Sequence, residues 1–126
     1  MSLPSILAPV FAQVGLVFVL VFFMVAARHG GVAGGPERAK LVSDCFSNQF
    51  EIPVLFFTLV PLAVLTRKAD LLFVVMSWIF VLSRLAHAAI HTGSNRQPAR
   101  GIAWLLGVAT LLVMWAVFAV RVLLVP

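Results

Sequence analysis

Long apolar runs separated by short polar segments dominate the chain. Three runs are nearly continuous, at about Ile6–Ala27, Asp70–Thr92 and Gly101–Val125, and a fourth at 52–65 follows an amphipathic stretch at 37–50. A helix rises 1.5 Å per residue, so about 20 apolar residues cross roughly 30 Å of hydrocarbon. The pattern predicts an all-α membrane protein, a single four-helix transmembrane bundle over residues 1–126.

Glycines and prolines mark the ends of these runs. Four glycines between His29 and Pro36 break the first helix, and Pro36-Glu37 suits the start of the second. Pro53 and Pro61 are expected to kink that second helix. The short turn at 66–70 makes the second and third helices antiparallel neighbours. The first run has no basic segment before it, so we expect a membrane span there and no cleaved signal.

Composition and charge agree with a membrane protein. The chain is 63% hydrophobic and 10% charged, against about 45–50% and roughly 25% in soluble domains. The net charge of +5 comes from residues at the ends of apolar runs, which orient a protein in the bilayer, so we expect no nucleic acid partner. The first and third connections hold Arg28, Arg38, Lys40, Arg96 and Arg100, and the opposite side holds Arg67, Lys68 and Arg121. The larger number of basic residues in the first and third connections predicts that these connections are cytoplasmic and that both termini are outside.

A polar stripe interrupts the third run. Arg84, His87 and His91 are spaced i, i+3 and i+7, so they share one helix face. Such side chains are costly in lipid and must face the bundle interior, a partner subunit or a water-filled cleft. We interpret the stripe as one wall of a site for a polar ligand.

The second helix carries a matching polar face. Asp44, Asn48 and Glu51 are spaced i, i+4 and i+7, and the four-span topology places them at the same membrane face as the stripe. With Arg96 and Arg100 they predict a charged pocket that suits a zwitterionic ligand. Structural alternatives stay open: Glu51 and Arg84 as an ion pair joining two helices, Asn48 as an interhelical hydrogen-bonding group, and both later arginines as headgroup anchors.

The sequence gives little reason to expect a metal. His87 and His91 have the i, i+4 spacing of a metal-binding pair, but no HExxH pattern supplies a third ligand. Cys45 is the sole cysteine, so it cannot form an internal disulfide, and we interpret it as an ordinary buried thiol. We therefore expect no metal.

Two blocks resemble the MAPEG family, the membrane-associated proteins in eicosanoid and glutathione metabolism. The first is Asn48-Gln49-Phe50-Glu51, followed by a proline and Phe56-Phe57. The second is Arg84-x-x-His87-x-x-x-His91, followed by Arg96-x-Pro98-x-Arg100. Together with the four-span layout, the resemblance covers nearly the whole chain and is closest to divergent bacterial-type members, which suggests a bacterial inner membrane.

The resemblance implies a homotrimer that binds glutathione between neighbouring subunits. Asn48 and Glu51 would hold the polar ends of the peptide, His87 and His91 would contact it, and Arg100 would stabilise its thiolate. The implied reaction is conjugation of a lipophilic electrophile from the bilayer, or reduction of a hydroperoxide.

Two positions depart from the family pattern. Asp44 stands where the family often has an arginine, and His91 stands where glutathione users commonly have a tyrosine. Either Arg28, Arg38 or Lys40 meets the glutathione carboxylate, or the ligand differs.

Another function remains open. A non-catalytic scaffold or accessory subunit of a larger membrane complex would keep the same polar groups as helix-joining pairs. A transporter is less consistent, because the polar residues cluster at one end instead of lining the whole depth of the membrane.

Overall fold

The computed structural model describes residues 2–94 and 97–124, and within those ranges all regular structure is helical. The helices are α1 (Leu3–Arg28), α2 (Gly35–Asn48), α3 (Ile52–Leu65), α4 (Leu71–Thr92) and α5 (Gln97–Leu124). Four stretches are long and apolar enough to cross a membrane, and α2 and α3 together make the second of them. The predicted four-helix membrane fold is confirmed.

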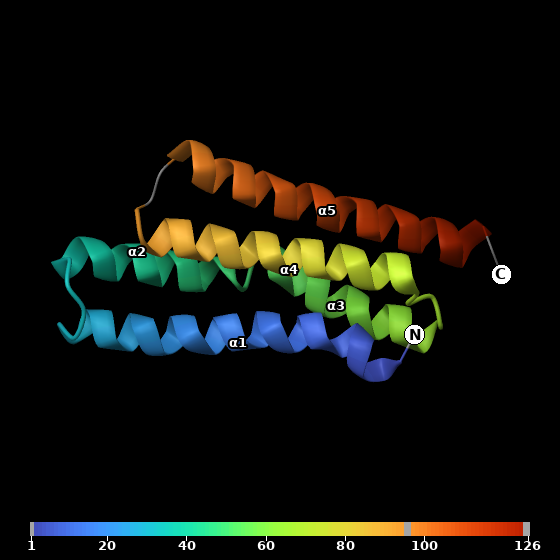
Figure 1. Cartoon of the computed structure of the whole chain (residues 1–126), viewed down its shortest axis with the longest axis horizontal. Helices are drawn as coiled ribbons and strands as arrows, with labels where there is room; N and C mark the ends of the chain where they lie inside the picture. Colours follow the sequence, from blue (N-terminus) through green and yellow to red (C-terminus); the bar gives the residue numbers. More distant parts are fainter. Residues whose placement is uncertain (1, 95–96, 125–126) are drawn as a thin grey trace.

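The spans run up and down through the bundle (Figure 1). The C-terminal ends of α1 and α4 lie together with the N-terminal ends of α2 and α5, and we call this the polar end. The opposite end holds the α3–α4 turn, the start of α1 and the finish of α5. Helix α4 contacts α1, α2 and α5, so its side chains have packed neighbours on several sides.

The core lies between α3, α4 and α5. Phe56 of α3 and Phe80 of α4 are both fully buried, with ring centroids 4.9 Å apart. Leu111 and Met114 of α5 complete this cluster. Large apolar side chains such as Phe22 and Leu105 are exposed on the outside of the bundle, as expected for a surface that contacts lipid.

The second span is interrupted where the sequence predicted a continuous, kinked helix. Helix α2 ends at Asn48 and α3 begins at Ile52, with Glu51 as the non-helical N-cap residue of α3. Pro53 explains the break, because a proline has no N–H to donate to the carbonyl four residues earlier. The expected i+7 register of Glu51 with Asp44 is therefore wrong.

The last helix begins earlier than predicted. It starts at Gln97 rather than Gly101, and Pro98 is its second residue, a position that suits proline. Arg100 thus lies within the first turn of α5 rather than in a connection.

A close contact joins α5 to α4 at Gly107. A Cβ placed on this glycine would lie 2.8 Å from the Ser83 hydroxyl oxygen and 3.5 Å from Cδ of Arg84. Small residues at such crossings let two membrane helices approach closely.

Candidate ligand-binding cleft

A cleft of about 330 Å³ opens at the polar end. Three helices line it: α2, α4 and α5. The lining residues are Asp44, Asn48, His87, His91, Arg100, Gly101 and Trp104. Five of the polar residues that were predicted to converge therefore line one cleft within one chain, while the role of each in binding stays a prediction.

Helical spacing places each pair of side chains in the cleft. Asp44 and Asn48 are one turn apart on α2, and His87 and His91 are one turn apart on α4. Asp44 and Arg100 both act electrostatically on His91, which places charges of both signs around one imidazole. The cleft can therefore meet the cationic and anionic groups of a zwitterion.

Arg84 lies one turn before His87 and is not part of the cleft lining. Its side chain is 1% exposed, and none of its three guanidinium nitrogens has a hydrogen-bond partner among the described residues. Glu51 and Cys45 act on it electrostatically. A buried charge without hydrogen bonds is expensive, so Arg84 is the strongest sign that this end of the bundle is built for more than packing.

Two other predicted site residues lie outside the cleft. Glu51 is exposed at the α2–α3 break, and Arg28 is exposed at the end of α1. Arg96 lies outside the described residues. Their roles in binding stay predictions.

A buried amide network fixes the end of α2. Gln13 of α1 donates from Nε2 to Oε1 of Gln49 at 2.8 Å, and Gln49 donates from Nε2 to the Cys45 carbonyl at 3.0 Å. The backbone N–H of Gln49 donates to the carbonyls of Phe46 and Ser47 and not to that of Cys45. The Gln49 side chain therefore satisfies the Cys45 carbonyl, which would otherwise lack a partner at the end of the helix. This network anchors α1 to the segment that carries Cys45 and Asn48.

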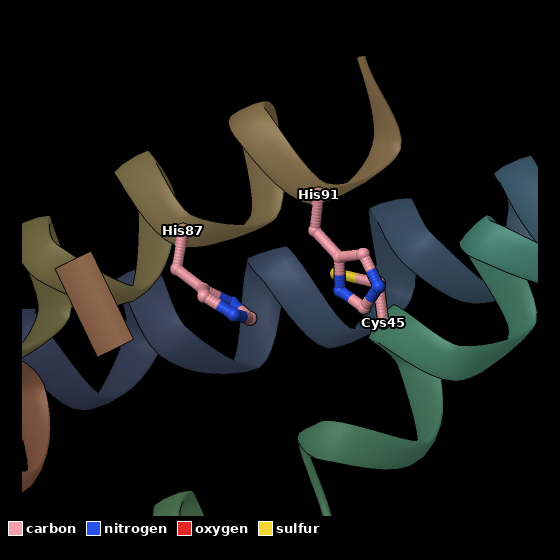
Figure 2. A group of neighbouring side chains, drawn as sticks. All are labelled: Cys45, His87 and His91. Carbon is pink, nitrogen blue, oxygen red and sulfur yellow. The ribbon is translucent and has the colours of Figure 1, made fainter. Parts of the chain in front are cut away.

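Cys45 meets the two histidines beside the cleft. One ligand atom from each of Cys45, His87 and His91 lies within 4.8 Å of the other two, and all three side chains are buried. Figure 2 shows both imidazoles pointing from α4 towards the space beside α2, where the Cys45 sulfur lies. The ring centroids of the two histidines are 5.4 Å apart.

A comparison with models of protein families matches residues 6–120 to the model of the MAPEG family. The chain belongs to the MAPEG family. This match covers most of the four spans and all residues that line the cleft, and it supports a membrane function related to glutathione at the level of the family. A search of curated proteins and a search of solved structures each found no match.

Two lining residues of this MAPEG protein were missed in the sequence. Gly101 follows Arg100 directly, and Trp104 lies one turn beyond it on the same face of α5. The signal that could have found Trp104 was this i+4 spacing, which becomes readable only once α5 is known to begin before Arg100.

Proposed function

We propose that the cleft binds a thiol peptide of the glutathione class and activates its thiol against lipophilic electrophiles or hydroperoxides. The observation that carries the proposal is the grouping of Asp44, Asn48, His91 and Arg100 in one cleft at the polar end of the bundle. The cleft volume of about 330 Å³ falls within the range of roughly 300–1,000 Å³ that is usual for small-molecule sites.

The side chains present suit such a ligand. Asp44 would accept the amino group, Asn48 would hydrogen-bond a peptide amide, and Arg100 with the histidines would face a carboxylate or the thiol. Asp44 in place of a family arginine implies that the amine, rather than a carboxylate, lies beside α2. The buried charge of Arg84 behind the cleft adds to the attraction for an anion.

The chemistry follows from the position of Arg100. A guanidinium close to a thiol favours the thiolate, which is the reactive nucleophile. In conjugation the thiolate sulfur bonds to the electrophilic carbon as the leaving group departs. In peroxide reduction it attacks the terminal oxygen, which gives a sulfenic acid and an alcohol, and a second thiol then releases water to form a disulfide.

The lipophilic substrate would arrive from the bilayer. Trp104 is 39% exposed while it lines the cleft, and Ile102 and Leu105 beside it are exposed apolar residues of α5. A substrate dissolved in lipid could therefore approach along α5 without crossing a polar surface.

We also propose a homotrimer in a bacterial inner membrane, with the polar end in the cytoplasm. Support comes from family membership and from the excess of basic residues at the polar end. In a trimer that holds the ligand between subunits, the exposed Glu51 and Arg28 would be available to a ligand that they do not meet within one chain.

The test is turnover of a lipophilic aryl halide and of an organic hydroperoxide by the purified full-length chain with glutathione. We expect Arg100→Ala to lower turnover about 100-fold, in the range of lost electrostatic stabilisation. Arg67→Gln changes an exposed arginine at the opposite end and should leave turnover unchanged. Equal turnover by both variants would contradict the proposal.

A scaffold or accessory subunit is the second candidate. It is favoured by the electrostatic attraction between Glu51 and the buried Arg84, which a helix-joining pair would also produce. It predicts that Arg100→Ala changes stability alone and that a defined partner protein copurifies with the chain.

A further inference from the structure

We propose that Cys45, His87 and His91 form a binding site for one monovalent copper ion. Cys45 comes from α2 and the two histidines come from α4 (Figure 2). The histidines also line the cleft, and Cys45 is not among its lining residues. The proposal goes beyond the thiol chemistry above and departs from the expectation, drawn from the sequence, that the chain binds no metal.

The geometry is close to that of a three-ligand site. A first-row metal holds a thiolate at about 2.3 Å and an imidazole nitrogen at about 2.0–2.1 Å, so ligand atoms around one ion are about 3.5–4 Å apart. Here they lie within 4.8 Å of one another. A movement of about 1 Å, available from side-chain rotation, would bring them to bonding distance of one ion.

Each of the two histidines carries an unsatisfied ring nitrogen. His87 and His91 are 3% and 6% exposed, and Nδ1 of each ring has no hydrogen-bond partner among the described residues. A buried nitrogen without a partner costs free energy that a metal bond would recover. This observation is independent of the spacing between the three ligand atoms.

The surrounding charge selects a monovalent ion. Arg84 acts electrostatically on Cys45 and on both histidines, and Arg100 acts on both histidines as well. Asp44 opposes these two arginines at His91 alone, so positive charge prevails around the cluster. Binding of a metal requires the thiolate, so the thiol proton is released to water. Exchange of that proton for Cu⁺ leaves the charge of the buried cluster unchanged, whereas Zn²⁺ would add one positive charge beside two arginines.

Ligand chemistry agrees with this choice. Thiolate is a soft ligand that selects Cu(I), and imidazole also binds copper. Structural zinc sites take four protein ligands, and the cluster supplies three. We therefore assign the site to Cu(I) rather than to Zn²⁺.

The test is an anaerobic titration of the full-length chain in detergent with Cu(I), in competition with a chromophoric copper chelator. We expect one copper per chain and at least about a 100-fold loss of affinity in Cys45→Ser and in His91→Asn, because each removes a metal ligand. His29→Asn is the matched control, since His29 is exposed at the end of α1, and it should bind like the wild type.

A second measurement tests the site without relying on variants that could fail to fold. The X-ray absorption spectrum of the copper-loaded wild type should show one sulfur and two nitrogen neighbours. Absence of stoichiometric copper, a spectrum without sulfur, or unchanged affinity in Cys45→Ser would overturn the site. Tighter binding of Zn²⁺ than of Cu(I) in the same titration would overturn the assignment to a monovalent ion.

Discussion

The opposite end and the polar end of the bundle each hold an arginine from a membrane span, in very different surroundings. At the opposite end, Nη1 of Arg121 lies 2.9 Å from Asp70 and also donates to the Lys68 carbonyl at 3.4 Å. At the polar end, Arg84 is almost fully buried, and its nitrogens have no hydrogen-bond partner among the described residues. The charge of Arg121 is met by a carboxylate of the same chain, and the contact fastens α5 to the α3–α4 turn. The buried charge of Arg84 would be stabilised by a ligand that brings negative charge to the cleft.

Among changes that compare the two ends, Arg84→Met should have the largest effect. Arg84→Met should weaken glutathione binding about 10-fold, or roughly 1.4 kcal/mol, because a positive charge behind the cleft is lost. Its thermal midpoint in detergent should stay the same or rise, since removal of a buried, unpaired charge is often neutral or stabilising. Isothermal titration and a thermal melt measure the two effects.

Arg121→Met is the matched variant at the opposite end. It breaks an ion pair with Asp70, so we expect a slightly lower thermal midpoint and unchanged glutathione binding. A loss of about 3–5 kcal/mol of stability in Arg84→Met, the cost of breaking a buried pair, would instead identify Arg84 and Glu51 as a structural pair and favour the scaffold.

Substitution of alanine for two glycines of the spans should change stability by a smaller amount, and in a different direction at each position. Gly107→Ala places a Cβ 2.8 Å from the Ser83 hydroxyl oxygen, which is itself bonded to the Phe80 carbonyl at 2.6 Å. We expect a loss of about 1 kcal/mol from overpacking and recovery in the double variant with Ser83→Ala. Gly15→Ala has open space around it and should be neutral or stabilising by up to about 1 kcal/mol. The reverse order of stability would show that α4 and α5 do not approach as closely as described.

The smallest effect should come from Asp70. The side-chain hydrogen bond from Arg121 is the main reason that the pKa of this carboxyl is lowered, and the Phe73 N–H adds to it. A lowered pKa adds stability above the pH at which the unfolded carboxyl titrates, and this stability is lost as the pH falls through the folded pKa. Because the pair is exposed, the contribution should stay below about 0.5 kcal/mol.

Asp70→Asn tests this contribution. Asparagine is an equally good N-cap, so the variant removes the ion pair and keeps the start of α4. Its thermal midpoint should match the wild type in acid and fall slightly below it at neutral pH. A difference that grows in acid would contradict the sign of the pKa shift.

The sequence predicted the spans well because their signals are local. Length and hydropathy of each run set the four spans, and the shared face of Arg84, His87 and His91 follows from helical periodicity alone. All three are buried, as the cost of polar groups in lipid requires.

The features that escaped prediction depend on geometry between helices. The meeting of Cys45 with the α4 histidines depends on how α2 is rotated against α4, and no spacing in the sequence reports that rotation. Pro53 was expected to kink the second span, but the break moves Glu51 out of register. The entry of Trp104 into the cleft depended on an α5 that begins at Gln97.

The most direct test of the ligand-binding cleft is the ultraviolet difference spectrum of glutathione titrated into the purified full-length chain at neutral pH. Cations around the cleft should stabilise the bound thiolate, so a saturable thiolate absorbance should appear in the wild type and be lost in Arg100→Ala. A flat spectrum at millimolar glutathione would contradict the account. An absorbance that persists unchanged in Arg100→Ala would contradict the role given to this arginine.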